Sequence, residues 1–214
     1  MTVDPEFIAS RTTELFLRDG TRVVIRPVVP EDKDKLAEAF SRLSPESRYR
    51  RFFSQIDELT PEMLKKLTEI DYDDHFAWVA AAPDEPGAPG VGAARYVRVP
   101  GEPEVAEAAV TIIDDFHGRG LGSVLLQALG AVAIENGIKR FRGYALEENE
   151  AIRRLLGEAD VRHEAPGLIR VEVDLPAQAE ELRDSPMYEI LRAVARGDGP
   201  RFLPAQPLTP ETST

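Results

Sequence analysis

The sequence predicts a single mixed α/β (α+β) domain, with a mixed central sheet of about six to seven strands and helices on both faces. Short apolar segments joined by Pro- and Gly-rich turns at 75–113 are typical of an antiparallel meander. Amphipathic helical segments precede the meander, and a more apolar helix opened by glycines follows it within 117–137. The chain has 214 residues, of which 43% are hydrophobic, and this is enough for one core.

Composition excludes several classes of protein and site. A net charge of −12 argues against sequence-independent binding to nucleic acid, which needs a basic face. The chain has no cysteine and only three histidines, so we expect no disulfide and no metal. It has no run near the ~20 apolar residues of a membrane span, and its N-terminus lacks signal-peptide features. These absences predict a cytoplasmic protein without a membrane partner.

The first third of the chain is expected to be mainly helical after one strand. Residues 1–20 form a mixed N-terminal lead-in to a strand at 22–27. A helix is predicted at 30–43, where a proline stands at the start and apolar residues recur at helical spacing. Ser44 and Thr60, each followed by Pro and Glu, are typical caps of two further helices.

The meander accounts for three strands, expected at 75–82, 91–99 and 105–113 and separated by the turns PDEPGAPG and PGEPE. The helix that follows places leucines on one stripe, so it should be well buried, and Asn136-Gly137 should end it.

After this helix, the sequence predicts an alternation of strands and helices. A strand, a short helix and a last strand are expected at 140–146, 149–156 and 168–175, which completes a domain over 21–176. A C-terminal amphipathic helix is predicted at 177–196. The Pro, Thr and Gly content of 197–214 predicts a mobile tail.

The segment 112–126, IIDDFHGRGLGSVLL, is the most informative part of the sequence. A strand runs into a loop that contains Gly118, Gly120 and Gly122, and the loop opens the apolar helix. Glycines let the backbone approach a ligand closely, and consecutive N–H groups at a helix N-terminus bind anions. The segment therefore predicts a phosphate or pyrophosphate site.

Several interpretations of this loop compete. A mononucleotide P-loop would need a lysine after its last glycine, and none is present. A dinucleotide fingerprint needs G-x-G-x-x-G in a parallel unit, whereas this chain has G-x-G-x-G after an antiparallel meander. A glycine-rich turn without a ligand and the pyrophosphate loop of an acyl-CoA-dependent N-acetyltransferase remain.

The segment 117–122, HGRGLG, resembles the signature [RQ]-x-x-G-x-[GA] of the GNAT superfamily of N-acetyltransferases, except that His117 replaces the usual Gln or Arg. The resemblance covers residues 20–175 and implies the GNAT fold. The segments 44–53 and 68–76 are similar to those of bacterial, in particular actinobacterial, protein lysine acetyltransferases. Mycobacterial members carry an N-terminal cyclic-nucleotide-binding domain. This chain begins almost directly at the acetyltransferase part, so regulation by a cyclic nucleotide is not implied for it.

The resemblance implies acetyl-CoA as cosubstrate and a primary amine as acceptor, with a protein lysine ε-amine as the leading candidate. There are two alternatives. The acceptor could be a small-molecule amine, or the chain could be a non-catalytic acyl-CoA-binding or sensing module on the same fold. Oligomeric state is left open, although the C-terminal helix offers an interface for a homodimer. The cofactor contacts that the resemblance implies are Ile112, Ile113, His117, Gly118, Arg119, Gly120, Leu121, Gly122, Ser123 and Asn149.

Glu107 is the predicted general base. It stands ten residues before the first position of the signature, where the similar protein acetyltransferases carry their catalytic Glu. A lysine amine has a pKa near ~10.4, so at neutral pH its proton must be removed before acyl transfer. Apolar neighbours would raise the pKa of Glu107 toward neutrality. A Tyr general acid, common about seven residues after Asn149 in the family, is absent from this chain.

The charges suggest a polarity across the site. Acids cluster at 57–74 and 102–107, which flank the acceptor side in this family. The basic cluster in 48–51 is expected on a solvated helix face, and His75 is expected at the start of a strand with local hydrogen bonds. The basic residues expected around the CoA half are Arg119, Lys139, Arg140 and Arg142.

Overall fold

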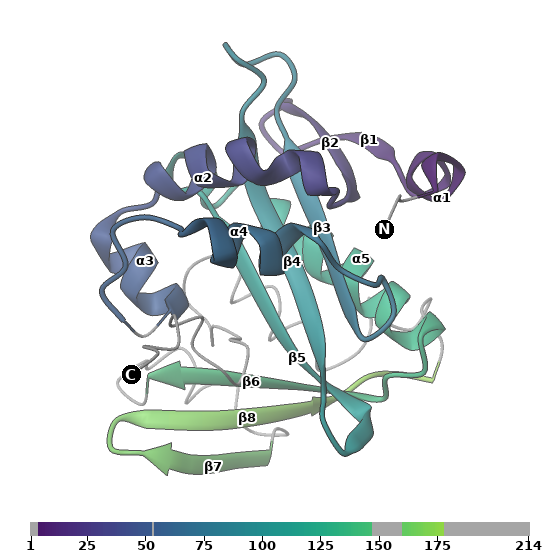
Figure 1. Cartoon of the computed structure of the whole chain (residues 1–214), viewed down its shortest axis with the longest axis vertical. Coiled ribbons are helices and arrows are strands. Elements are labelled where there is room, and N and C mark those ends of the chain that lie inside the picture. The colour runs from purple at the N-terminus through teal and green to yellow at the C-terminus, as the bar shows by residue number, and fades with distance from the viewer. Residues whose placement is uncertain (1–3, 53, 147–159, 178–214) are drawn as a thin grey trace.

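The computed structural model describes residues 4–52, 54–146 and 160–177 (Figure 1). The strands are β1 (Thr13–Phe16), β2 (Arg22–Pro27), β3 (His75–Ala81), β4 (Gly90–Val99), β5 (Glu102–Ile112), β6 (Arg140–Leu146), β7 (Asp160–Ala165) and β8 (Leu168–Asp174). These described strands form one eight-stranded sheet in the order β1-β2-β3-β4-β5-β6-β8-β7. The mixed α/β class is confirmed, with slightly more strands than expected.

The two additional strands, β1 and β7, lie at the edges of the sheet. β1 falls within the predicted lead-in and is mostly exposed, with the sequence TELF. β7 reads DVRHEA and is also largely polar. Neither segment shows the apolar alternation of a half-buried strand, because an edge strand can be solvated on both faces.

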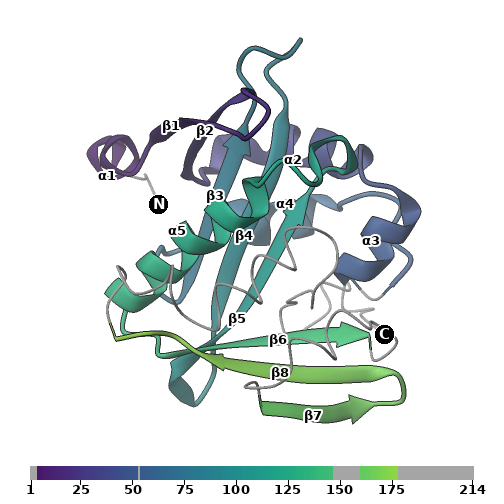
Figure 2. The ribbon, with the colours of Figure 1, turned by 180° about the vertical axis from the view of Figure 1, so that it is seen from behind.

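Helices cover both faces of the sheet. The helical segments are α1 (Pro5–Ser10), η1 (Pro30–Asp32), α2 (Lys33–Ser41), α3 (Pro45–Phe52), α4 (Pro61–Thr68), η2 (Asp114–Phe116) and α5 (Leu121–Glu135). Helices α2 and α4 lie over one face with α3 beside them, and α5 lies over the opposite face (Figures 1 and 2). The leucine stripe of α5 is buried against the sheet as predicted, since Leu121, Leu125 and Leu129 are at most 1% exposed.

Local signals in the sequence place the helix ends correctly. The hydroxyl of Thr60 accepts a hydrogen bond from the Met63 amide, and the hydroxyl of Ser44 accepts one from the Ser47 amide. Helix α5 ends at Glu135 with Asn136 as its C-cap, and the following Gly137 adopts a φ of +76°. The second turn of the meander is shorter than predicted, because β5 already begins at Glu102.

The described sheet is antiparallel except where β5 meets β6. These two strands pair in parallel only from Val105 to Glu107, opposite 140–142. On its other edge β5 stays paired with β4 as far as Ile112. Beyond Glu107 the strands β5 and β6 therefore separate, and the sheet opens into a wedge (Figures 1 and 2).

Some predicted elements lie outside the described residues. These are the short helix at 149–156, most of the C-terminal helix at 177–196 and the tail at 197–214. Within the ranges that the structure describes, no helix is long and apolar enough to cross a bilayer.

Candidate active site

Glu107 stands where β5 and β6 part. It is the last residue of β5 in the parallel ladder. Side chains alternate along a strand, so Glu107 points to the same face as Thr111, whose hydroxyl accepts a hydrogen bond from Arg51 of α3. Only 4% of Glu107 is exposed. The sequence signal thus places a buried carboxylate at the opening of the wedge, on the face covered by α2 and α4.

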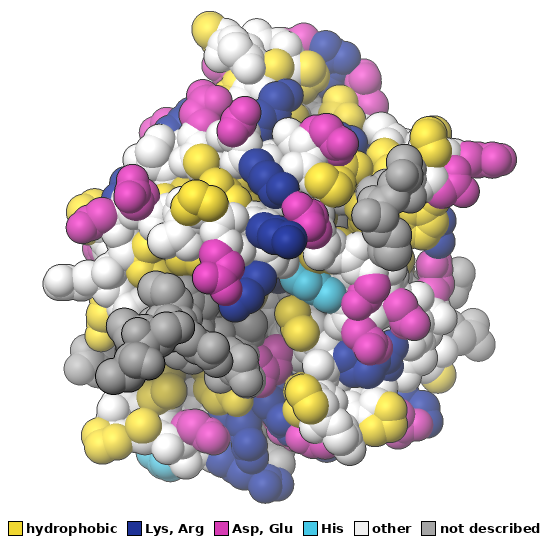
Figure 3. Space-filling view, viewed as in Figure 1, with side chains coloured by type: hydrophobic (Ala, Val, Ile, Leu, Met, Phe, Trp, Pro, Cys, Tyr) yellow, Lys and Arg dark blue, Asp and Glu magenta, His cyan; other side chains and the backbone are white. Residues whose placement is uncertain are grey.

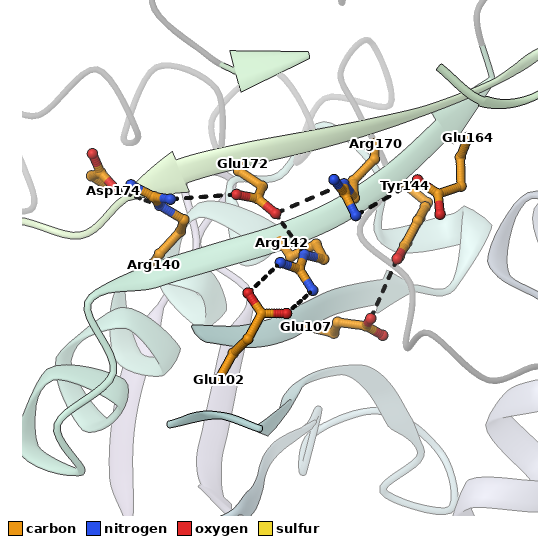
Figure 4. A network of polar contacts seen from close by, with 9 residues as sticks. All are labelled: Glu102, Glu107, Arg140, Arg142, Tyr144, Glu164, Arg170, Glu172 and Asp174. Carbon is orange, nitrogen blue, oxygen red and sulfur yellow. Dashed lines mark hydrogen bonds and ion pairs between the residues drawn. The ribbon is translucent and has the colours of Figure 1, made fainter. Parts of the chain in front are cut away.

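The surroundings of Glu107 make it a weak acid. Burial raises its pKa to about 7, although Arg142 and a hydrogen bond from Tyr144 favour the ionised form. The Tyr144 hydroxyl lies 3.4 Å from Oε1 of Glu107 (Figure 4). A carboxyl group with this pKa is partly ionised at neutral pH and still basic enough to accept a proton.

Arg142 is buried next to Glu107, but other carboxylates neutralise it. It donates two hydrogen bonds to Glu102, at 2.9 and 2.8 Å, and one to Glu172 at 2.6 Å (Figure 4). Glu172 also lies near Arg140, at 3.5 Å, and Arg170, at 3.8 Å. Glu107 can therefore stay close to a cation without forming an ion pair with it.

This network corrects part of the predicted polarity. Arg140 and Arg142 were expected around the CoA half of the site, whereas here they pair with acids of β5 and β8. Glu102 was expected in the turn PGEPE, and it lies on β5 because the turn is shorter. Lys and Arg side chains also form a row down the middle of the face over α2 and α4, between the acids (Figure 3).

The glycine loop presents backbone N–H groups at the start of α5. Gly118 and Gly120 have φ angles of +76° and +92°, which favour glycine. Gly120 is the N-cap residue, and none of the described side chains caps the helix. The first helical hydrogen bond runs from the Val124 amide to the Gly120 carbonyl, so the preceding amides have no partner within the helix. An uncapped N-terminus of a 15-residue helix fits a pyrophosphate group.

His117 ties this loop to the end of β5. Its Nε2 lies 2.9 Å from the Ile112 carbonyl, and because a carbonyl only accepts, Nε2 must carry the hydrogen. Its Nδ1 lies 3.8 Å from the carboxylate of Asp114. The amide of Ile113 donates to the Val91 carbonyl on β4. Thus two of the predicted cofactor contacts, at Ile112 and Ile113, have backbone groups already engaged within the protein.

Arg119 folds back against the turn after β1. Its guanidinium lies 3.1 Å from the carboxylate of Asp19, donates to the Asp115 carbonyl at 2.7 Å, and stacks over Phe116. Arg18, which sequence reasoning missed, lies at the N-terminus of α5: its Nε is 3.5 Å from where a Cβ on Gly120 would stand. No motif marks Arg18, because only the folded turn brings it there.

The remaining predicted contacts fall into two groups. The side chain of Leu121 is buried in the core, so only its backbone and that of Gly122 face the loop. The side chain of Ser123 and the whole of Asn149 lie outside what the structure describes.

Of two basic residues considered in the sequence, Arg51 lies elsewhere than expected, whereas His75 begins a strand, β3, as predicted. Arg51, predicted on a solvated helix face, is 7% exposed and faces the sheet. His75 lies in register with Val97, which pairs with Glu107, so His75 and Glu107 share one face two strands apart. Burial lowers the pKa of His75 to about 3, and its Nε2 is buried without a hydrogen-bond partner among the described residues. His75 is therefore neutral.

Comparisons with known proteins agree with this geometry. The family described as Acetyltransferase (GNAT) domain matches residues 22–162. Acetyltransferase Pat of Mycolicibacterium smegmatis is 35% identical over 194 residues, which cover 84% of this chain and 56% of that protein. The chain thus spans about half the length of this relative.

Solved structures show the same fold. The GNAT domain of PAT from S. lividans superimposes with a TM-score of 0.67 at 26% identity, over 81% of this chain and all of that one. The structure named yncA from Salmonella typhimurium, solved with its cofactor acetyl-CoA, has a TM-score of 0.51 at 18% identity, over 73% of this chain and 96% of that one.

Proposed function

The chain belongs to the GNAT acetyltransferase family, and from this membership we propose that it transfers an acetyl group from acetyl-CoA to a primary amine, with Glu107 as general base. The observation that carries the proposal is the buried carboxylate of Glu107 at the point where β5 and β6 separate. The same strand leads directly into the glycine loop, so one rigid element holds both the base and the loop that would receive the cofactor.

The glycine loop is the proposed site for the pyrophosphate of acetyl-CoA. The uncapped amides at the start of α5 would receive the phosphate oxygens, and Arg18 adds a positive charge beside them. The acetyl-CoA in the Salmonella structure supports this choice of cofactor at the level of the shared fold. When bound, acetyl-CoA would supply the activated acetyl group as a thioester.

The role of Glu107 follows from its pKa. A protonated amine is not a nucleophile, so a proton must leave the acceptor nitrogen before or during attack. With a pKa of about 7, Glu107 can accept that proton directly or through a water molecule near neutral pH. Tyr144 holds the carboxylate from the β6 side and contributes to its orientation.

A protein lysine ε-amine is the proposed acceptor. The similarity to Acetyltransferase Pat and to the GNAT domain of PAT supports this choice. The base lies at the open wedge between two strands. A long, narrow lysine side chain is suited to reach such a site from outside.

The decisive experiment separates turnover from cofactor binding. Glu107→Gln keeps the size and polarity of the side chain but removes the base, so it should lower kcat at least about 100-fold while the Kd for acetyl-CoA stays within about twofold. Glu104→Gln is the matched control on the same strand, where an exposed carboxylate pairs with Lys139, and it should leave both constants unchanged. Full activity in Glu107→Gln would refute the assignment of the base. Acetyl-CoA binding without turnover on either protein lysines or an amine panel would favour a sensing module.

A further inference from the structure

A cavity to which the proposed reaction assigns no role lies between the sheet and the helices α2, α3 and α4. Its volume is about 920 Å³ when the open space at its mouth is included. Glu107 is not among its lining residues. Much of its wall is apolar and includes Leu36, Phe40, Leu43, Leu67 and Val79.

Two buried arginines line this largely apolar space. Arg51 comes from α3 and Arg95 from β4, and each is only 7% exposed. Arg51 donates from Nε to the hydroxyl of Thr111 at 3.0 Å, and Arg95 donates to the carbonyl of Leu67 at 2.8 Å. Both acceptors are neutral, so neither hydrogen bond compensates a guanidinium charge.

The described part of the chain places no carboxylate within 4.0 Å of either guanidinium. The one acid that lines the cavity, Asp32, already accepts two hydrogen bonds from Arg26, at 2.5 and 2.7 Å. Lys35 lies at the edge of the cavity and adds another positive charge. The cavity is thus strongly cationic, within a chain whose net charge is −12.

Uncompensated buried charge is costly, and an anion would relieve the cost. Burial lowers the pKa of Arg51 to about 10, and burial together with repulsion from Arg51 lowers the pKa of Arg95 to about 9. Both therefore remain charged at neutral pH. A planar guanidinium binds a carboxylate through paired hydrogen bonds, and an apolar wall favours a hydrocarbon body behind that group.

We propose that this cavity binds a small organic acid, whose carboxylate pairs with Arg51 and Arg95 and whose apolar body packs beneath α2 and α4. The cavity does not include Glu107, so the proposal stands whether or not Glu107 is the base, although one expected cofactor contact, Ile113, lies in the cavity wall. Thr111, which holds Arg51, lies on β5 four residues after Glu107, so the occupied cavity would contact the strand that carries the base.

The test uses probes that share one apolar body and differ in charge. We expect 3-phenylpropionate to bind the full chain in isothermal titration calorimetry and to raise its Tm. 3-Phenylpropanol and 3-phenylpropylamine should bind at least about tenfold more weakly, because they lack the anion. Acetate and inorganic phosphate should also bind more weakly, because they lack the apolar body. Equal binding of the acid and the alcohol, or no binding of the acid, would overturn the proposal.

Two variants locate the binding site. Arg51→Met and Arg95→Met each remove a buried charge without a carboxylate partner, so neither should lower the Tm of the free protein strongly. Each should weaken 3-phenylpropionate at least about tenfold. Arg42→Met, which removes an arginine paired with Asp115 outside the cavity, is the control and should leave binding unchanged. Unchanged binding in both Arg51→Met and Arg95→Met would place the acid elsewhere and contradict the proposal.

Discussion

Glu107 and Arg142 are register partners in the parallel ladder between β5 and β6, yet they form no ion pair. Arg142 instead donates hydrogen bonds to Glu102 and Glu172. The arginine lowers the pKa of Glu107 only through space, which is too weak to offset burial. The carboxyl group of Glu107 is therefore about half ionised at neutral pH, as a general base requires.

The first prediction concerns pH and the stability of the fold. The ordinary pKa of Glu107 is 4.5, and burial raises it to about 7 in the folded chain, so the folded state holds the proton more tightly than the unfolded chain. Stability should therefore fall as pH rises from about 4.5 to about 7, by roughly 3 kcal/mol. Glu107→Gln should remove this decline. Urea unfolding of both proteins at pH 5 and pH 8 measures it, and an equal decline in both would contradict the pKa of Glu107.

The second prediction concerns Tyr144. Tyr144→Phe removes the hydroxyl that donates to Glu107 and leaves the ring in place. The ionised carboxylate loses a hydrogen bond, so its pKa should rise and the pH profile of kcat/KM should move to higher pH, by less than about one pH unit. Activity at high pH should approach that of the unaltered protein. A profile that keeps its midpoint and loses height at all pH values would show that Tyr144 acts on another group.

The third prediction concerns the ion-pair network around Arg142. Arg142→Met leaves Glu172 with only the longer contacts to Arg140 and Arg170, and we expect a loss of about 3 kcal/mol in urea unfolding. The double variant Arg142→Met/Glu172→Met removes both buried charges and should recover part of this loss. If the double variant were less stable by the full sum of the two single losses, the pair would not be coupled.

Much of the fold can be predicted from the sequence, because helix caps, glycine turns and apolar faces determine it. The stripe of α5, the caps at Ser44 and Thr60 and the positive φ of Gly120 each follow from short-range chemistry. The edge strands β1 and β7 could not be found in this way, because they bury too little to show a pattern.

The candidate site likewise has a part that the sequence predicts and a part that it does not. Glu107 and the glycine loop carry a motif, whereas the partners of Arg142 come from two strands 30 and 40 residues away. The burial of Arg51 was missed because charge alone predicts exposure. Pairings and cavities of this kind arise only when distant elements pack together.

The fourth prediction concerns backbone strain in the glycine loop. Gly120→Ala forces alanine to a φ of +92°, which costs about 1–2 kcal/mol and changes the direction of the amides at the start of α5. We expect the KM for acetyl-CoA to rise at least about tenfold. Gly101→Ala is the matched control, since Gly101 has a φ of +81° in the turn between β4 and β5. It should lose similar stability and leave this KM unchanged. Equal effects of both variants on KM would mean that the loop does not hold the cofactor.

The last prediction concerns His117, which stands where the family usually has Gln or Arg. Its Nε2 hydrogen holds the Ile112 carbonyl, so it fixes the loop to the end of β5. His117→Ala loses this donor and should raise the KM for acetyl-CoA several-fold with a smaller effect on kcat. His117→Gln keeps a donor of similar reach and should retain most of the affinity. If the histidine instead acted in proton transfer, the glutamine variant would lose kcat as severely as the alanine variant, and initial rates of both at saturating acetyl-CoA decide between these outcomes.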